Sequence, residues 1–506
     1  MTQHISCIQD FKACFGTAFD CTDTTCTDRA QSTYGYQSTL LGVLYPESRQ
    51  SIVQAITLAK QYGVQLSPIS RGKNWGWGSS APHQAQTILL DLSRMRGILD
   101  FSEQLGYITI QAGVSVAEVI AFLERQGSQR MLPMGGTTAD ASLIGHLCER
   151  GIAVGTSYHD RASHVCGLQA ILGDGRVIHT GMRRYGQSAV AATHRWGPGA
   201  SLESLLTQSD FAIVTEATIW LPTKGENAFA VIAASHQLAD LVDTFRDCEG
   251  LGLRVAAQIY NRAKVEKLFF ARNPAMRQQL PPGDWVAIAP VYPASAQHAE
   301  ADRTLILQRL QQHEDCKAVT LPLDASFGPF NGQAYANDDV LLGMLYRWGE
   351  HQRGPGVDPQ RDQCGILWGC FAAPMLGDAV TQACTLITKI LAAHDLEVFQ
   401  AVHSVSERAC LLFPQLSFPQ ARRGEAVKAM QELTDSLHNL GFPVYRVPAG
   451  LGGVAPSGDD HDAVVQQIRQ VFNPHHVLAQ GKYTPSVKPA TSASLEAVTD
   501  PVHAFN

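Results

Sequence analysis

Hydrophobic residues recur with two different periods in the first part of the chain. In Pro46–Lys60 the apolar positions are spaced three and four apart and share one face, which predicts an amphipathic helix. Ser115 and Glu118 have the spacing of a capping box, and they predict a second helix that runs to Arg125. Shorter apolar runs predict three strands: Val64–Ile69, Thr87–Asp91 and Tyr107–Ala112.

The second half of the chain alternates short apolar runs with longer amphipathic segments. The expected strands are Phe229–Ala233, Trp285–Ala289, Ala318–Leu321, Gly365–Phe371 and Glu397–Ser404. The expected helices are His236–Glu249, Ala296–Gln312, Gly377–His394, Pro419–Leu440 and Ala463–Phe472. A long, glycine-containing connection is expected over Ser326–Pro359. This order predicts a second sheet that is backed by helices.

A glycine-rich segment, Ser70–Ser80, follows the first expected strand. Three glycines in seven residues allow a tight curl whose backbone N–H groups converge on an anion. Arg71 and Lys73 add positive charge, which suits a pyrophosphate. The spacing is that of neither a Rossmann turn nor a P-loop, so an ordinary tight turn is the alternative interpretation.

Further motifs follow this loop in a definite order. They are Gly145–Gly151, Tyr158–Asp160, Cys166–Gly181 with a hairpin turn at Asp174-Gly175, Trp196–Thr215, Asp358–Trp368 and Gly481-Lys482. Together with the loop, they resemble the vanillyl-alcohol oxidase and 4-cresol dehydrogenase family of flavoproteins. The resemblance spans about residues 35–485, and His146 stands where the family usually has Asn.

The resemblance implies an α+β fold and a two-domain flavoprotein. The FAD-binding domain, of two α/β subdomains, would take residues 1–223 and a return segment, 442–485. A cap domain, 224–441, would contribute a mainly antiparallel sheet backed by helices, and 486–506 would be a flexible tail. The residues that the resemblance assigns to FAD are Ser70, Arg71, Gly72, Lys73, Asn74, Trp75, Gly145, His146, Ile213 and Lys482.

The family attaches its flavin covalently by one of two main routes, and neither has its residue here. The cap-strand His or Tyr falls at Ile366 or Gly369, depending on the register, and the loop His falls at Lys73. We therefore predict non-covalent FAD. A cysteinyl link stays an alternative, because thiolates are competent nucleophiles and three cysteines lie in segments near the expected ring: Cys166, Cys364 and Cys370.

Candidate substrate contacts come from the same resemblance. Tyr445 and Arg446 match a Tyr-Arg pair that holds a phenolate in relatives, and such donors stabilise an anion in a poorly solvated pocket. The alternative is a strand residue beside a solvated arginine. The third member of the family's set is Trp77 here, and an indole donates one hydrogen bond but cannot ionise.

The family's proton-transfer residues are replaced. Its Asp near the flavin falls at Thr137 and its Tyr falls near Val154, so we place both residues in the substrate pocket without an acid–base role. His403 is a candidate base, since histidine titrates near neutral pH, with a core histidine as the alternative. His159 and Asp160 are weaker candidates.

Composition narrows the class of protein. The net charge of −7 over 506 residues, without basic runs, argues against nucleic acid, and the sequence has no apolar run of membrane-spanning length. Met1–Cys7 has no signal-peptide character, which predicts a cytoplasmic protein. The twelve cysteines are expected to be reduced thiols. The acids at Asp459–Asp462 are expected at a helix N-terminus rather than around a metal, so no metal is predicted.

Two functions are open from the sequence. The first is an FAD-dependent oxidoreductase that moves a hydride from a small aromatic or phenol-like molecule to the flavin, with O₂ or a redox protein as electron acceptor. The second is a flavin-binding partner subunit with little turnover of its own, because the expected Asp and Tyr are missing. A homodimer is compatible with either function.

Overall fold

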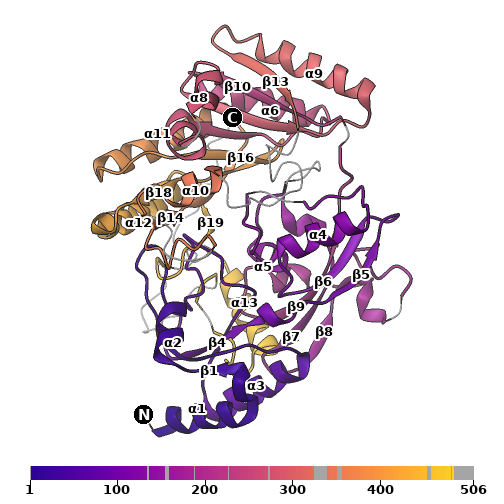
Figure 1. Ribbon diagram of the computed structural model, residues 1–506, viewed down its shortest axis with the longest axis vertical. Coiled ribbons are helices and arrows are strands. Elements are labelled where there is room, and N and C mark those ends of the chain that lie inside the picture. Colours follow the sequence, from indigo (N-terminus) through magenta and orange to yellow (C-terminus); the bar gives the residue numbers. More distant parts are fainter. Residues whose placement is uncertain are drawn as a thin grey trace.

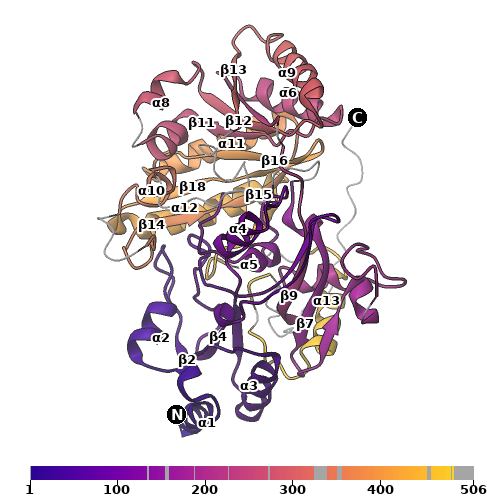
Figure 2. The same ribbon diagram turned by 45° about the vertical axis from the view of Figure 1, so that its right-hand side comes forward.

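The computed structural model describes residues 2–133, 136–153, 159–186, 188–225, 227–271, 274–323, 339–349, 356–452, 457–479 and 481–483. Three sheets of four or more strands organise these residues (Figures 1 and 2). Two of them form the lower part of the molecule in Figure 1, and the third, with its helices, forms the upper part. The mixture of helices and sheets confirms the predicted α+β class.

The first sheet carries the glycine-rich loop. Its strands, in spatial order, are β1 (Phe19–Asp20), β2 (Leu40–Leu44), β4 (Thr87–Asp91) and β3 (Leu66–Ile69). β2 and β3 both pair with β4 in the parallel direction, and the loop leaves the carboxyl end of β3. The helices in this part of the chain are α1 (Thr2–Phe15), α2 (Asp23–Arg29) and α3 (Arg49–Tyr62). Parallel strands that are covered by helices place such a loop at one sheet edge.

The second sheet has five antiparallel strands. In order they are β5 (Ile98–Ser102), β6 (Tyr107–Gln111), β9 (Ala212–Trp220), β7 (Val165–Leu172) and β8 (Val177–His179). The helices associated with this part are α4 (Val116–Arg125), α5 (Leu143–Cys148) and α13 (His461–Phe472). Side chains from the first and second sheets share one hydrophobic core.

The third sheet has eight antiparallel strands. In order they are β13 (Lys317–Pro322), β10 (Phe229–Ser235), β12 (Trp285–Val291), β11 (Gln258–Asn261), β16 (Ala401–Ser406), β17 (Ala409–Leu412), β15 (Cys370–Pro374) and β19 (Val444–Arg446). Four helices pack in a layer on it: α6 (Leu238–Gly250), α9 (Ala296–Leu310), α11 (Gly377–Ala393) and α12 (Arg423–Asn439). This arrangement confirms the predicted antiparallel sheet backed by helices.

Side chains alternate between the two faces of this large sheet, as the period of a strand requires. In β10, Val231 packs in the core under the helices and Ile232 in a separate cluster on the other face. The same alternation directs Cys370 and Tyr445 away from the helices and toward Trp77 of the glycine-rich loop. The face of the large sheet opposite these four helices therefore faces the loop.

Short elements complete the fold. β14 (Gly365–Trp368) pairs with β18 (Gln415–Phe418), and α7 (Arg262–Lys264) continues into a π-helical turn, η6 (Val265–Phe269). Two further helices are α8 (Pro274–Gln279) and α10 (Asp339–Leu345). None of the helices in the described ranges combines the length and apolar character that crossing a bilayer requires.

Two expected strands differ from those observed. The run 365–371 is divided at Gly369 into β14 and β15, which belong to different sheets, because the Gly369 N–H bonds to Pro414 O (2.9 Å) and breaks the ladder. The run 397–404 becomes a strand only from Ala401. The predicted domain boundaries stay a prediction, although β19, in the expected return segment, is the last strand of the large sheet. Val154 and the tail 486–506 lie outside the described residues.

Candidate functional site

A pocket runs along the glycine-rich loop. Its lining includes Ser70–Asn74 of the loop, parts of α5 and β9, and Lys482 near the end of the chain. The backbone N–H groups of four consecutive residues, Gly72, Lys73, Asn74 and Trp75, have no acceptor within the described part of the chain. Buried or half-buried donors of this kind require a partner, and convergent N–H groups favour an anion.

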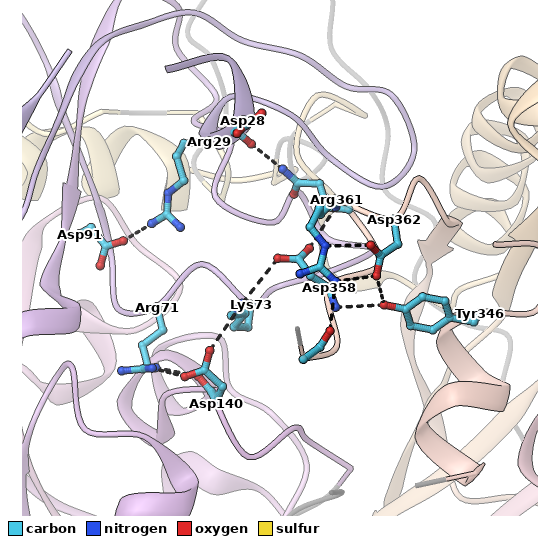
Figure 3. A network of polar contacts seen from close by, with 12 residues as sticks. Asp28, Arg29, Arg71, Lys73, Asp91, Asp140, Tyr346, Asp358, Arg361 and Asp362 are labelled. Carbon is cyan, nitrogen blue, oxygen red and sulfur yellow. Dashed lines mark hydrogen bonds and ion pairs between the residues drawn. The ribbon is translucent and has the colours of Figure 1, made fainter. Parts of the chain in front are cut away.

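The charged side chains of the loop also hold it in place (Figure 3). Arg71 pairs with Asp140, and its Nη1 donates to Gly113 O (3.1 Å). Lys73 Nζ lies 3.5 Å from Asp140 Oδ2 and 3.7 Å from Asp358 Oδ2, so it connects the loop with the segment before β14. Both cations therefore have protein carboxylates beside them. The free backbone N–H groups, rather than these two charges, are the clearest anion-binding feature of the loop.

The three glycines of the loop have two different tasks. Gly72 has a φ of +68°, and a Cβ there would lie 3.1 Å from Ser80 Cβ. A Cβ on Gly76 would overlap the Trp368 indole, and one on Gly78 would lie 2.5 Å from Ala449 Cβ. Gly76 and Gly78 therefore allow close packing against other segments of the protein, whereas Gly72 lines the pocket and shapes its turn.

Glu149 lines this pocket and is the centre of an ionic cluster. Lys482 Nζ lies 2.6 Å from Glu149 Oε1, and the Tyr483 hydroxyl donates to Oε2 at 2.6 Å. Arg446 Nη2 lies 3.6 Å from the same Oε2. Burial raises the pKa of Glu149, but Lys482 and Arg446 outweigh it and lower that pKa to about 2. The cluster joins α5 to the last described residues.

A residue predicted to line the substrate pocket, Thr137, contacts a residue predicted to bind FAD, His146 of α5. Thr137 Oγ1 is 2.5 Å from His146 Nε2. Burial lowers the pKa of His146 well below its ordinary value, with Arg161 and Arg446 adding to the effect, so the ring is neutral. Gly145 lies against Ser70. A neutral hydrogen-bonded histidine suits a positioning role better than it suits proton transfer.

Ile213 points away from the pocket. Its side chain packs in the core shared by the first two sheets, while Ala212 and Val214, its neighbours in β9, line the pocket. This alternation follows from the period of a strand. Any contact of Ile213 with a ligand in the pocket would therefore come from its backbone.

Trp77, Tyr445 and Arg446 gather between the pocket and the large sheet. The Arg446 guanidinium carbon lies 4.3 Å from the centre of the Trp77 ring, and its Nη2 donates to Asn74 Oδ1 (3.1 Å). Arg446 Nε is buried and has no acceptor in the described structure. Burial lowers the pKa of the neighbouring Arg161 to about 9, and the charge of Arg446 adds to the effect. The buried, unpartnered Nε of Arg446 favours a bound hydrogen-bond acceptor.

Tyr445 is the neutral member of this group. Burial raises the pKa of its phenol above the ordinary value, with Asp160 adding to the effect, so it is protonated near pH 7. Its hydroxyl makes no hydrogen bond to the described part of the chain. It packs with Trp77 in one hydrophobic cluster. The tyrosine can therefore donate a hydrogen bond to a bound oxygen.

His403 lies apart from the pocket residues, on the same face of the large sheet. Its ring centre is 5.0 Å from that of Phe413 and 5.7 Å from that of Tyr260. Burial lowers the pKa of His403 to about 3, and the charge of Lys264 lowers it further. A histidine of such low basicity is a weak proton acceptor at neutral pH.

The comparisons with known proteins agree with this geometry. Residues 40–181 match the model of an FAD binding domain. The chain is 28% identical to 1'-carboxy-chondrochloren decarboxylase from Chondromyces crocatus, and the alignment covers 94% of this chain and 96% of that protein. Over 86% of its length it is 22% identical to 85% of the 4-cresol dehydrogenase [hydroxylating] flavoprotein subunit from Pseudomonas putida.

A solved structure extends the likeness to the whole fold. The 4-ethylphenol oxidase from Gulosibacter chungangensis superposes with a TM-score of 0.80 and 20% identity, over 96% of this chain and 98% of that one. The chain is therefore similar to flavoproteins of the vanillyl-alcohol oxidase and 4-cresol dehydrogenase family along nearly its whole length. FAD is its cofactor, and this flavoprotein is an FAD-dependent oxidoreductase, as the sequence motifs predicted.

The pocket fits FAD on the chain's own evidence. The free N–H groups of Gly72–Trp75 match the acceptor oxygens of a pyrophosphate. Lys482 and Arg446 also line the pocket, and their positive charge would stabilise the electron density that a flavin ring gains on reduction. The individual cofactor contacts of this flavoprotein stay predictions.

The thiols bear on how the flavin is attached. All twelve cysteines are free, and Cys148 lines the pocket, whereas Cys166, Cys364 and Cys370 are buried elsewhere. Burial raises the pKa of Cys148 to about 12, with Glu149 adding to the effect. A protonated thiol is a poor nucleophile. Among the described residues, no three potential metal ligands gather.

Sequence reasoning missed several residues of this site. Tyr483 directly follows the Gly481-Lys482 motif, so its position next to Lys482 was the available signal. Trp368, which packs on Gly76, and Asp140, which binds Arg71, come from segments with no local pattern that indicates a contact. Lys264, beside His403, also carried no signal in the sequence.

Proposed function

We propose that this flavoprotein oxidises a small aromatic, phenol-like molecule at a C–H bond next to its ring. When it is bound, FAD supplies the redox chemistry by accepting the hydride at its N5 atom. The chain's own residues bind and orient the substrate. Arg446, Tyr445 and Trp77 would hold the phenolic oxygen, because they combine one fixed positive charge with two hydrogen-bond donors.

The unpaired Nε of Arg446 is the observation that carries this proposal. A buried guanidinium N–H with no acceptor costs free energy unless a ligand supplies one. Burial lowers the pKa of Arg161 and the charge of Arg446 lowers it further, so the two cations act on one region. A phenolate or a phenol that is losing its proton satisfies both requirements.

No acid–base residue is assigned. Thr137 is hydrogen-bonded to His146 and cannot accept a proton at neutral pH, and His403 has low basicity. The hydroxyl group of a phenol can itself lose its proton when Arg446 stabilises the resulting anion. Such a substrate therefore needs less help from a protein base than a plain alcohol does.

The test uses the FAD-loaded protein without oxygen. Alkyl phenols, aromatic alcohols, aromatic amines and carboxylated aromatics are added in turn, and bleaching of the flavin absorption band is followed. Carboxylated compounds are included because one relative is named as a decarboxylase of a carboxy compound. We expect an alkyl phenol or a ring-substituted relative of it to bleach the flavin.

Two variants then test the role of Arg446. Arg446→Met removes the charge-assisted contact and should lower the reduction rate per mole of substrate by roughly ten- to a hundred-fold. Arg446→Lys keeps the charge but lacks the planar guanidinium, so its rate of flavin reduction should lie between those of the wild-type protein and Arg446→Met. Equal rates in all three proteins would place the substrate elsewhere, and no bleaching by any compound would favour the flavin-binding partner subunit.

The electron acceptor is tested on the same preparation. Once the flavin has been reduced, its reoxidation is timed with O₂ and with a one-electron protein acceptor such as cytochrome c. Rapid reoxidation by O₂ would indicate an oxidase. Slow reoxidation by O₂ together with rapid electron transfer to the protein acceptor would indicate a dehydrogenase.

A further inference from the structure

Lys264 is a buried lysine with no carboxylate partner among the described residues. Only 2% of the residue is exposed, and in the described structure its Nζ has no carboxylate oxygen within 4.0 Å and no hydrogen bond. Two aromatic rings lie near it: Nζ is 4.8 Å from the ring centre of Trp368 and 6.0 Å from that of Tyr260. Buried charges in proteins are normally paired, because desolvating an ammonium group is costly.

The neighbouring cations of the same turn have partners. Arg262 Nη1 lies 3.2 Å from Glu266 Oε1, and Lys267 Nζ lies 2.8 Å from Glu397 Oε1. Lys264 lies between these two cations in sequence, where α7 becomes the π-helical turn η6. Lys264 is buried, whereas Lys267 is exposed. Such π-helical turns frequently occur at functional sites.

A second basic group faces the same region. Both ring nitrogens of His403 are buried and have no hydrogen-bond partner in the described structure. Burial lowers the pKa of Lys264 to about 7, and it lowers the pKa of His403 with a contribution from Lys264. An imidazole always has one N–H to donate when neutral. When Lys264 is protonated, the two side chains therefore offer one ammonium and one ring N–H that have no acceptor among the described residues.

Aromatic side chains connect this pair with the proposed substrate site. The backbone N–H of Trp368, whose ring lies near Lys264 Nζ, donates to Gly76 O (3.2 Å), next to Trp77 in the sequence. Phe413, which is next to His403, packs against the cluster around Lys264 and also against the cluster that contains Trp77 and Tyr445. Trp368 and Phe413 therefore lie close to both sets of donors.

We propose that Lys264 and His403 form a second anchor in the substrate site, which binds a carboxylate group of the substrate. This inference rests on the proposed function and narrows its substrate class to aromatic acids. A carboxylate is a singly charged acceptor with two oxygens, so it matches one ammonium and one imidazole N–H. A phosphate dianion would need more positive charge than the described residues supply there.

The test measures binding, and it does not require turnover. The probes are benzoate, phenylacetate and 3-phenylpropionate, each compared with its amide, so that the distance from ring to carboxylate is scanned. Dissociation constants are measured by calorimetry on the FAD-loaded protein. For at least one of the three lengths we expect the wild-type protein to bind the acid roughly ten- to a hundred-fold more tightly than the amide.

Two variants at neighbouring lysines make the test specific. Lys264→Met should abolish the preference for the acid and leave the affinity for the amide unchanged. Lys267→Met removes an exposed lysine of the same turn and should keep the preference. Since methionine replaces an uncompensated ammonium, Lys264→Met should unfold at the same temperature as the wild-type protein or higher.

The outcomes separate this inference from the proposed function. No preference for any acid in the wild-type protein, or equal losses of acid and amide binding in Lys264→Met, would overturn the carboxylate site. Equal effects of the two lysine variants would reduce it to a long-range charge effect and would also overturn it. If acids are preferred but no compound bleaches the flavin, the carboxylate site stands and the proposed oxidation fails.

Discussion

Replacing Gly76 by alanine should loosen the glycine-rich loop from the large sheet. Gly76 has a φ of +77°, which costs a side chain about 1–2 kcal/mol. The new methyl group would also overlap the Trp368 indole, and overpacking of this kind costs about 1–3 kcal/mol more. Because the same loop lines the FAD pocket, we expect lower stability together with weaker FAD binding.

Gly127 provides a matched control. Its φ is +62°, but a Cβ there would meet nothing within 4 Å, so Gly127→Ala includes the backbone cost without the clash. In urea unfolding followed by tryptophan fluorescence, Gly76→Ala should have the lower midpoint. Its free energy of unfolding should be about 1–3 kcal/mol lower than that of Gly127→Ala. FAD affinity, from fluorescence titration of the apoprotein, should fall only in Gly76→Ala. Equal midpoints and equal FAD affinities in the two variants would refute the packing argument.

Three further expectations concern the pocket. Acid precipitation should release all the flavin into a yellow supernatant, also from Cys148→Ser, because the high pKa of Cys148 keeps its thiol protonated; a washed pellet that stays yellow would contradict non-covalent binding. Gly72→Val should abolish FAD loading, since its side chain would crowd Ser80 and Ile69 at a positive φ, and a protein that still purifies yellow would disprove this. Glu149→Gln should be less stable than the wild type above about pH 4.3, because the pKa of Glu149 is lowered in the folded wild-type protein. The difference should disappear as the pH falls through about 2. Thermal midpoints of the two proteins that differ equally at pH 6 and pH 2 would argue against this reasoning.

Local patterns predicted the elements whose signals are local. The capping box at Ser115 and Glu118 is present, and α4 ends at Arg125 as expected. The first predicted helix begins three residues later than proposed, at Arg49, because Ser48 provides its N-cap. The strands β17 and β18 were missed: each is four residues long and too short to show a period.

The candidate site divides in the same way. The loop could be located from its glycines and its preceding strand, which are neighbours in the sequence. The assignment of Gly76 to packing could not, because its partner, Trp368, comes from a distant strand. Lys264 is the extreme case: its isolation from carboxylates depends on where α7, β14 and β16 meet, and no window of the sequence contains all three.

The order in which the chain is synthesised gives the Glu149 cluster a further consequence. Glu149 and Lys482 are separated by 333 positions, and the Tyr34 hydroxyl bonds to Ala449 O across 415 positions. Contacts of such long range form late and slowly, since a large loop must close first. A growing polypeptide therefore carries its loop long before it has the residues that close the pocket. We therefore expect tight retention of the coenzyme only after translation has reached Lys482 and this residue has met Glu149.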